Sequence, residues 1–293
     1  MTTPSPDSAT MRHDPLSPLV HRLVALALEE DLALGDPTTD ATVSASQHGL
    51  GTIRAKAELV LAGTAVARAV CIAVDPGIEL TFYHSDGERL APGAVIGLVS
   101  GSVRSLLKAE RTILNFLQRL SGVATLTARY VAETAGTTAR IVDTRKTTPG
   151  WRVLEKAAVV AGGGHNHRFS LGSGVLIKDN HVDAAGGVRA AVLAAKARVP
   201  HLLGIEVEVR DLTELDEAIG AGAQMVLLDN MPLDQLAEAV RRAKATRVLT
   251  EASGGVNLAT VRGIAQTGVD LISVGALTHS ATAVDINLKV VPT

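Results

Sequence analysis

The sequence predicts an α/β protein in which an incomplete β/α barrel follows a separate N-terminal α+β domain. From Arg140 onward, short apolar runs alternate with helical patterns, which is typical of β/α units. Apolar residues make up 46% of the 293 residues and aromatic residues only 2%, so the core must consist of Val, Leu, Ile and Ala. A doubly wound open sheet is the alternative, but the chain contains no G-x-G-x-x-G motif and no Walker loop.

Composition and charge argue against two classes of partner. The formal net charge is −2 and there is no basic run, so nucleic-acid binding is not expected. The longest apolar stretch, residues 60–74, is interrupted by Arg68 and is too short to span a bilayer. Residues 1–16 lack the apolar segment of a signal peptide and are predicted to form a disordered tail. Cys71 is the only cysteine, so a disulfide framework is not expected. We expect a cytoplasmic protein.

Residues 17–122 are predicted to form the N-terminal α+β domain, because strands and helices there do not alternate strictly. Ser17 and Pro18 supply the start of a helix, and Ser85-Asp86-Gly87 suits a hairpin turn. The predicted elements are helices over 17–31, 64–74 and 105–130, strands over 51–60, 78–83, from 88 onward and over 94–103, a turn-rich loop over 35–40, and a possible helix break near 121–122.

Residues 123–281 are predicted to contain the barrel. Its strand candidates are 140–143, 174–178, 203–209, 224–228, 246–251 and 269–274, and its helix candidates are 149–161, 184–197, 211–221, 232–244 and 257–267. Asp211 with Glu214 forms a capping-box pattern, and Asn257 can cap the last of these helices. Six or seven strands are visible rather than eight, so the barrel is expected to be incomplete.

Four cations stand close to the ends of two apolar runs. Arg145 and Lys146 come just after the first run of the barrel, Arg168 precedes the second, and Lys178 follows it directly. The carboxyl ends of barrel strands converge, so these side chains should share one mouth. Each could be a solvated loop charge, but together they would repel one another unless an anion lay between them. The sequence therefore predicts a site for a strongly negative ligand.

Acidic side chains and glycines follow the later strands. Glu206 and Glu208 are two residues apart on one strand and so share a face, which should be the barrel interior. With Asp229 they suit a hydrated Mg²⁺ or the hydroxyls of a sugar, and the alternative for Glu206 is a salt bridge to a barrel cation. The segments at Ser253-Gly254-Gly255 and Gly275 let backbone N–H groups approach a phosphate, although a simple tight turn is the alternative for 253–255.

Two further chemistries are not expected. His165, His167 and His181 lie close in sequence, but no acidic or cysteine ligand stands at zinc spacing. No nucleophile elbow is present either, which argues against a Ser/His/Asp hydrolase. Arg111 lies on the shoulder of the apolar stripe of the long helix, where a plain surface arginine is the alternative to a functional one.

A series of motifs resembles one family. DTRKTTPG, GGGHNHR, LIKDNH, IEVEV, LLDN, EASGG and ISVGALTHS occur in this order, with EDLALGDPTTD and AERTILNFLQRLSG upstream. Together they resemble quinolinate phosphoribosyltransferase (nicotinate-nucleotide diphosphorylase, carboxylating) from about Ser17 to the end of the chain.

The resemblance implies a sandwich-like N-terminal domain to which residues 282–293 return, a TIM-like incomplete barrel, and a homodimer with shared active sites. The implied substrates are quinolinate and phosphoribosyl pyrophosphate, the implied cofactor is Mg²⁺, and the implied products are nicotinate mononucleotide, pyrophosphate and CO₂, a step of NAD biosynthesis. The implied acceptor pocket comprises Arg145, Lys146, His167, Arg168 and Lys178, with Arg111 from the partner subunit, and Thr144 is a further implied substrate-binding residue.

The resemblance also implies a sugar–phosphate side. Glu208 and Asp229 would serve the ribose and the Mg²⁺, directly or through water, and Ser253, Gly254, Gly255 and Gly275 would hold the phosphate. The residues expected to take part in catalysis are Lys146, Lys178, Glu208 and Asp229.

Two alternatives stand beside this function. The first is a diverged relative with another acceptor, such as nicotinate, and the second is a non-catalytic anion-binding module. Lys178 and Asn166 argue against the first, because they complete a pocket for two carboxylates. Glu208 and Asp229 argue against the second, since simple anion capture gains nothing from carboxylates in its pocket.

Overall fold

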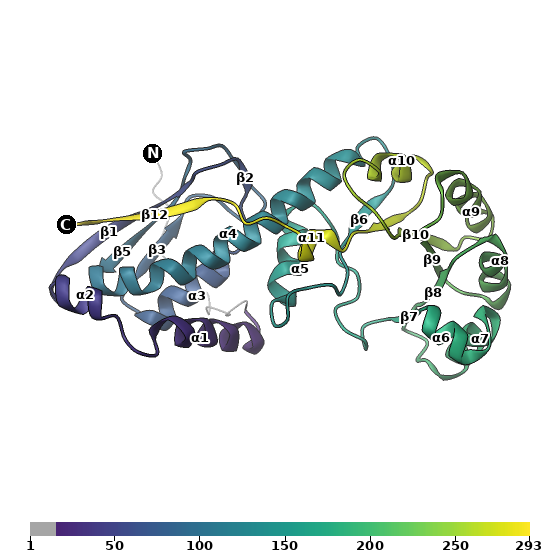
Figure 1. Cartoon of the computed structure of the whole chain (residues 1–293), viewed down its shortest axis with the longest axis horizontal. Helices are drawn as coiled ribbons and strands as arrows, with labels where there is room; N and C mark the ends of the chain where they lie inside the picture. The colour runs from purple at the N-terminus through teal and green to yellow at the C-terminus, as the bar shows by residue number, and fades with distance from the viewer. Residues whose placement is uncertain (1–15) are drawn as a thin grey trace, which may run out of the picture.

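The computed structural model describes residues 16–293, which form two lobes joined by one long helix (Figure 1). Apart from Leu16, the tail predicted over residues 1–16 lies outside the described residues. An antiparallel four-stranded sheet forms the basis of the first lobe, and a parallel six-stranded sheet that of the second. The predicted fold class, a separate α+β region followed by an incomplete β/α barrel, is therefore confirmed.

The first lobe packs helices against its antiparallel sheet, whose strand order is β12-β1-β5-β3. Its elements are α1 (Pro18–Leu32), α2 (Pro37–Thr42), β1 (His48–Ala55), β2 (Leu59–Val60), α3 (Thr64–Val74), β3 (Glu79–Phe82), β4 (Arg89–Leu90), β5 (Val95–Ser102) and the C-terminal strand β12 (Ile286–Pro292). Strand β12 pairs antiparallel with β1, with Ile53 opposite Leu288, so the end of the chain crosses back from the second lobe (Figure 1).

Helix α4 (Val103–Glu133) connects the two lobes without interruption. Its first half packs against α3 and the sheet of the first lobe, and its second half contacts α5 and β6 of the other lobe. The break predicted near Ser121-Gly122 is absent. Gly122 instead allows a close approach, because a Cβ atom there would lie 2.2 Å from the carbonyl oxygen of Thr282. This glycine lets the returning C-terminal segment lie directly on the helix.

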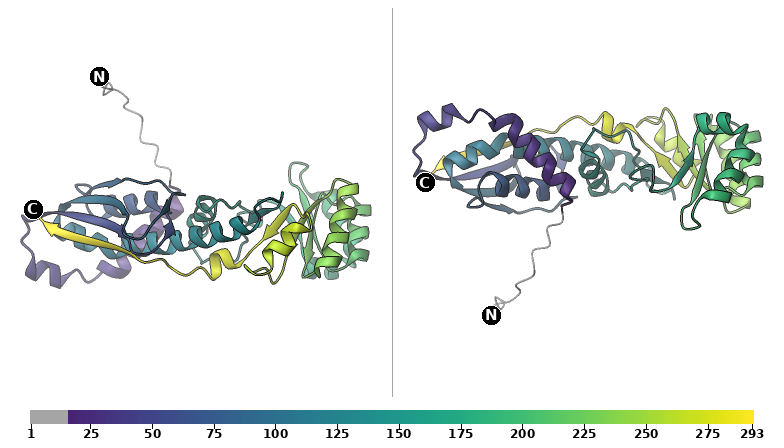
Figure 2. Two further views of the ribbon diagram at one scale, coloured as in Figure 1. Left: turned by 90° about the horizontal axis from the view of Figure 1, so that it is seen from above. Right: turned by 90° about the horizontal axis from the view of Figure 1, so that it is seen from below.

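The second lobe is a parallel sheet rolled into an open arc with helices on its outer side (Figures 1 and 2). Its elements are β6 (Arg140–Val142), α5 (Arg152–Ala161), β7 (Val175–Ile177), α6 (Asp179–Ala185), α7 (Val188–Arg198), β8 (Ile205–Val209), α8 (Leu212–Ala221), β9 (Met225–Asp229), α9 (Leu233–Ala245), β10 (Leu249–Ser253), α10 (Val261–Gln266), β11 (Leu271–Ser273) and α11 (Ala276–His279). The strand order is β6-β11-β10-β9-β8-β7, so β6 and β7 are edge strands and the described part of the barrel is not closed.

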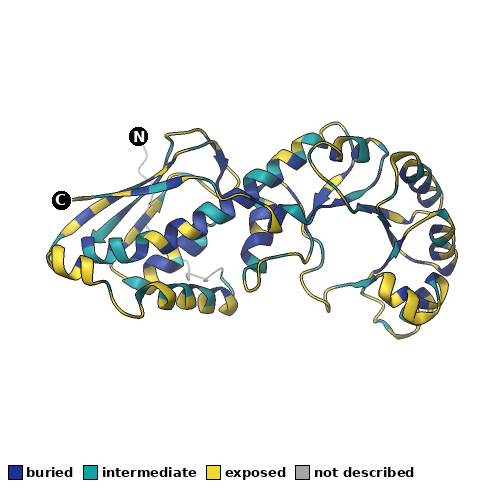
Figure 3. Cartoon of the chain, viewed as in Figure 1, coloured by how far each residue is buried: buried dark blue, intermediate teal, exposed yellow. Residues whose placement is uncertain are grey.

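Burial follows the expected apolar pattern. The strands of the second lobe and the inner sides of its helices are buried, whereas the outer helix faces are exposed (Figure 3). In the first lobe, Val66, Val70, Ile113 and Leu117 belong to the core that α3 and α4 share. Cys71 is buried there and makes no disulfide. No helix of the described residues is long and apolar enough to cross a membrane.

Three further local predictions were wrong. The loop predicted over 35–40 contains the short helix α2, because the Asp36 carboxylate accepts the Thr39 N–H and caps it. The predicted hairpin around Asp86 does not form: β3 pairs with β5, and β4 pairs with β2. The single helix predicted over 184–197 is divided into α6 and α7 at Gly186 and Gly187, both of which have positive φ.

Candidate active site

The carboxyl ends of the parallel strands surround a cavity of about 520 Å³. All predicted site residues line it except Arg111, Glu208 and Asp229. The lining residues are Thr144, Arg145, Lys146, His167, Arg168, Leu176, Lys178, Leu227, Glu251, Ser253, Gly254, Gly255, Val256, Ser273, Val274, Gly275, Ala276 and His279. Side chains from loops far apart in sequence thus meet at one end of the arc.

One side of the cavity is built from glycine-containing loops. Gly254 has φ +88°, and a Cβ atom there would lie 2.2 Å from the Asn230 side chain, so only glycine fits this position. Gly255 also has positive φ, at +61°. Glycines carry no side chain of their own, which lets an anion approach the backbone N–H groups of these loops.

Lys146 lies across the glycine side of the cavity. A Cβ atom at Gly275 would approach Lys146 Cδ to 2.9 Å, so the lysine stem lies against this glycine. The backbone of Lys146 is fixed at both ends of the residue: its N–H donates to Thr144 Oγ1 (3.0 Å), and its carbonyl accepts from Thr278 Oγ1 (2.8 Å). The ammonium group is thereby held near the glycine loops while its surface stays exposed.

The opposite side carries two arginines. The Arg168 side chain is partly buried, and its Nη1 donates to the carbonyl oxygen of Gly174 (3.0 Å). Burial, followed by the positive charge of Arg145, lowers the pKa of Arg168. The positive charge of Arg145 therefore disfavours the charged form of Arg168. A bound carboxylate would offset the repulsion between the two arginines.

Lys178, Glu208 and Asp229 form a polar group at the ends of β7, β8 and β9. Lys178 Nζ lies 3.4 Å from Glu208 Oε2. Burial raises the pKa of Glu208, and the negative charge of Asp229 raises it further. Asp229 stands opposite Ser253 in the register of β9 and β10, so the acids adjoin the glycine side of the cavity. Lys178 lies between these acids and the arginine side.

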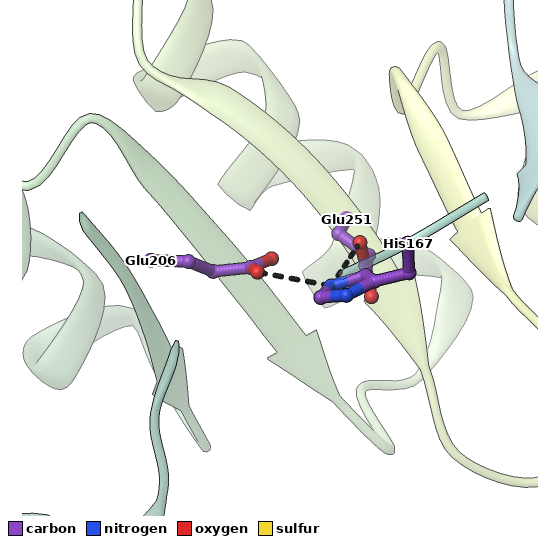
Figure 4. Close-up of side chains that lie close together, drawn as sticks. All are labelled: His167, Glu206 and Glu251. Carbon is purple, nitrogen blue, oxygen red and sulfur yellow. Dashed lines mark hydrogen bonds and ion pairs between the residues drawn. The ribbon is translucent and has the colours of Figure 1, made fainter. Parts of the chain in front are cut away.

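A cluster of one histidine and two acids lies deeper (Figure 4). His167 Nε2 is 3.2 Å from Glu206 Oε2 and 3.5 Å from Glu251 Oε2. The two glutamates are only 6% and 1% exposed. Burial, together with the charge of Glu206, raises the pKa of Glu251 to about 7. Glu251 therefore retains a proton much more readily than a solvated glutamate does.

The hydrogen bonds of the His167 ring define its tautomer. The Arg168 backbone N–H donates to Nδ1 (2.7 Å), so Nδ1 is an acceptor and the ring proton belongs on Nε2. Burial lowers the pKa of His167, but the two carboxylates outweigh this effect and raise it. A second ring proton would nevertheless have to displace the Arg168 N–H. We therefore assign the neutral Nε2–H form.

The same geometry bears on metal binding. The ligand atoms of His167, Glu206 and Glu251 all lie within 4.8 Å of one another. A metal on Nε2 requires the ring proton on Nδ1, where it is normally donated to an acceptor. Here Nδ1 faces a donor instead, so this cluster is poorly suited to a metal ion.

A buried ion pair supports the loop that carries His167. Lys156 and Asp143 are both fully buried and form an ion pair. Lys156 Nζ also donates to the carbonyl oxygen of His167 (2.9 Å), while Asp143 Oδ1 accepts the His167 N–H (2.9 Å). Both backbone groups of His167 are thus held by one ion pair.

Sequence reasoning missed several of these residues. Glu251 was seen only as part of a strand end, and His279 only as part of a motif, yet both line the cavity. Glu206 contacts His167, and among the described residues no ion pair joins it to one of the four barrel cations, so its predicted salt bridge to a barrel cation is not formed. Arg111 lies exposed on α4 and does not line the cavity of its own chain.

An open β/α barrel whose strand ends gather cations, acids and glycine loops around one cavity is the architecture of a phosphate-handling enzyme. The chain belongs to the quinolinate phosphoribosyl transferase family, whose N-terminal domain matches residues 36–121 and whose C-terminal domain matches residues 123–289.

Relatives with a named function match this chain over most of its length. It is 46% identical to the nicotinate-nucleotide pyrophosphorylase [carboxylating] of Mycobacterium leprae (89% of this chain, 94% of the other). It is 41% identical to the probable nicotinate-nucleotide pyrophosphorylase [carboxylating] of Bacillus subtilis (89% and 90%). The structure of the nicotinate-nucleotide pyrophosphorylase from Francisella tularensis superposes with a TM-score of 0.88 at 40% identity, covering 93% of this chain and 96% of the other.

Proposed function

We propose that this chain transfers the phosphoribosyl group of phosphoribosyl pyrophosphate to quinolinate with decarboxylation, giving nicotinate mononucleotide, pyrophosphate and CO₂. The observation that carries this proposal is the convergence of Arg145, Lys146, Arg168 and Lys178 around one cavity that also has glycine loops. A dicarboxylate and a polyphosphate together supply the negative charge that four neighbouring cations require. The names of the relatives support the same reaction.

The acceptor occupies the arginine side in this proposal. Arg145 and Arg168 suit planar, bidentate recognition of carboxylates, and Lys178 supplies a point charge from the neighbouring strand end. Thr144 and His167 complete this side of the cavity. Two carboxylates on adjacent ring carbons would be bound by cations from different loops, which favours quinolinate over a pyridine with a single carboxylate.

The phosphoribosyl donor occupies the glycine side. Backbone N–H groups at Gly254, Gly255 and Gly275 would bind the 5′-phosphate with the hydroxyl of Ser253, and Lys146 adds a positive charge from across the cavity. Glu208 and Asp229 lie next to this side and would accept hydrogen bonds from the ribose hydroxyls.

Glu208 and Asp229 also fit a magnesium ion. Burial raises the pKa of Glu208 and the negative charge of Asp229 adds to this rise; a divalent cation held directly or through water would relieve the repulsion between the two carboxylates. Carboxylate oxygens are the ligands that Mg²⁺ prefers. When bound, Mg²⁺ would neutralise charge on the pyrophosphate.

The chain's own residues would act by position and charge. The ring nitrogen of quinolinate attacks the anomeric carbon as the bond to pyrophosphate breaks. Lys146 would stabilise the negative charge of the leaving group, and Glu208 with Asp229 would stabilise the positive charge that develops on the sugar. The 2-carboxylate then departs as CO₂. The electron pair of the broken bond stays on ring carbon 2 as a carbanion that the adjacent positive nitrogen stabilises, and this carbon then takes up a proton from water. No side chain has to form a covalent bond, so fixed geometry provides most of the acceleration.

We further propose that two chains form a homodimer with shared active sites, and that the N-terminal domain spans residues 17–122 and the barrel residues 123–281. Arg111 supports the shared site: it is exposed on α4 and does not line its own chain's cavity. In a two-fold dimer, it would reach the acceptor side of the partner's cavity.

Mixing two inactive variants tests the shared site. Arg111→Ala and Lys178→Ala should each be nearly inactive alone at a quinolinate concentration near the wild-type KM. If half the dimers in a co-refolded sample are mixed, one of the two sites in each mixed dimer is intact, and activity should recover to ~25% of wild type. No recovery, with mixed dimers shown to be present, would place Arg111 outside the partner's site.

The reaction is tested by comparing acceptors with the purified protein, phosphoribosyl pyrophosphate and Mg²⁺. Quinolinate should give nicotinate mononucleotide, whereas nicotinate should give little or none. Turnover with nicotinate and none with quinolinate would refute the assignment of the acceptor.

A further inference from the structure

The cluster of His167, Glu206 and Glu251 lies between two cavities. The active-site cavity is above it, and a second cavity of about 540 Å³ lies toward the amino ends of the strands, where Arg140, Gln224 and Leu249 line it. His167, Arg168 and Glu251 line both cavities. The cluster is therefore the floor of the active-site cavity, and its shape determines how His167 and Arg168 face the ligand.

Every polar group of His167 is already engaged. Its backbone N–H and carbonyl are bound by Asp143 and Lys156, its Nδ1 accepts the Arg168 N–H, and its Nε2 faces the two glutamates. A histidine held in this way has no free nitrogen to offer to a carboxylate ligand. It can instead fix the backbone of the residue that follows it.

We propose that Glu206 and Glu251 are positioning residues, which hold His167 as the neutral Nε2–H tautomer so that its Nδ1 fixes the backbone of Arg168 at the wall of the cavity. This inference deepens the proposed function and rests on it for the identity of the ligand. It assigns Arg168 the contact with the acceptor's carboxylate, while His167 supplies orientation without charge.

Two acids suit the positioning of the His167 ring better than a single acid would. Glu206 Oε2 accepts the Nε2–H at 3.2 Å, and Glu251 Oε2 on β10 lies 3.5 Å from the same nitrogen, so both acids contact one ring nitrogen. Glu251 Oε2 has no hydrogen-bond partner among the described residues.

The charges around Glu251 explain how two acids can share one N–H. Glu206 on β8, His167 on its loop and Lys178 after β7 all act on it, and burial with the Glu206 charge raises the pKa of Glu251 to about 7. Near neutral pH, Glu251 therefore keeps part of its proton, which limits its repulsion of an anionic ligand in the active-site cavity.

The tautomer can be measured on the wild-type protein. In protein labelled with ¹⁵N-histidine, long-range ¹H–¹⁵N spectra distinguish the two neutral tautomers and the imidazolium ion, and the His167 signal is assigned by its loss in His167→Gln. The proposal predicts the neutral Nε2–H form at pH 7. The Nδ1–H form or an imidazolium ion would overturn it, whatever reaction the protein catalyses.

Kinetics of isosteric variants test the link to Arg168. Glu251→Gln keeps the size of the side chain but weakens a charge-assisted contact to a neutral one, so the KM for quinolinate should rise roughly fivefold. Glu251→Leu removes the acceptor and should raise it at least about tenfold. The KM for phosphoribosyl pyrophosphate should change less than about twofold, because the donor lies on the glycine side.

A matched control separates positioning from a general effect. Glu217→Gln makes the same chemical change on the exposed surface of α8 and should leave both KM values unchanged. Equal rises in both KM values with Glu251→Gln, or no change in either, would overturn the positioning role. Failure to use quinolinate at all would instead refute the proposed function, and the tautomer measurement would still decide the role of the cluster.

Discussion

Removing the buried charge of Lys156 should destabilise the protein strongly. In Lys156→Met the side chain keeps a similar length, but Asp143 is left buried without its cation. Nζ contacts three groups in the folded chain: the Asp143 carboxylate, the His167 carbonyl at 2.9 Å and the Phe169 ring, whose centroid is 4.9 Å away. Breaking a fully buried pair by removing one partner costs about 3–5 kcal/mol.

The pH dependence of this cost has a definite sign. Burial already raises the pKa of Asp143, and Lys156 opposes that rise. Without the lysine the pKa of Asp143 should rise further, so the variant can relieve the buried charge by binding a proton as the pH falls. The loss of stability should therefore be larger at pH 8 than at pH 5.

Urea denaturation followed by circular dichroism at both pH values measures this loss, and Asp143→Asn/Lys156→Met is the matched control. The double variant should lose less stability than the sum of the two single variants, because neither charge is left alone. A cost below about 1 kcal/mol for Lys156→Met, or full additivity, would refute the reasoning.

Four further variants test other parts of the structure. Lys178→Ala should raise the KM for quinolinate, and Asp229→Ala the KM for phosphoribosyl pyrophosphate, each corresponding to about 1.5–3 kcal/mol; unchanged quinolinate kinetics in Lys178→Ala would count against the acceptor site. Gly254→Ala should weaken phosphoribosyl pyrophosphate binding at least about tenfold, since its φ is +88° and the new Cβ would meet Asn230; wild-type affinity measured by calorimetry would contradict this. The pKa of Glu251 is raised from 4.5 to about 7, so its contribution to stability is present below pH 4.5 and lost as the pH rises through 7. Glu251→Gln should therefore gain stability relative to wild type between pH 5 and pH 8, by at most about 3 kcal/mol, and a constant difference in melting temperature across that range would refute this.

The cations at the mouth of the cavity were predictable because their positions follow from the local order of residues along the sequence. Arg145, Lys146 and Lys178 directly follow apolar runs, and parallel strand ends necessarily converge, so no knowledge of tertiary contacts was needed. The same argument predicted Ser253 and Gly254 beside them. Glycine at 254 has a physical cause in its positive φ and in the Asn230 side chain that occupies the space of a Cβ atom.

The buried ion pair that holds the His167 loop was not predictable in the same way. The partners Lys156 and Asp143 lie on a helix and after a strand, and nothing in their spacing shows that both are buried together. The wrong hairpin has a similar origin: Asp86 suits a turn, but its carboxylate instead accepts the N–H groups of Gly63 and Thr64 at the start of α3. Contacts of this kind depend on which elements pack together, which local pattern does not contain.

Following the fate of a labelled carboxylate tests the proposed reaction most directly. Purified protein is supplied with phosphoribosyl pyrophosphate, Mg²⁺ and quinolinate carrying ¹³C in its 2-carboxylate, and the products are followed by NMR. The proposed reaction predicts that labelled CO₂, nicotinate mononucleotide and pyrophosphate form in equal amounts, and that nucleotide formation is much slower with Lys178→Ala at a quinolinate concentration near the wild-type KM. Label retained in a nucleotide product, or CO₂ released without any nucleotide, would contradict it.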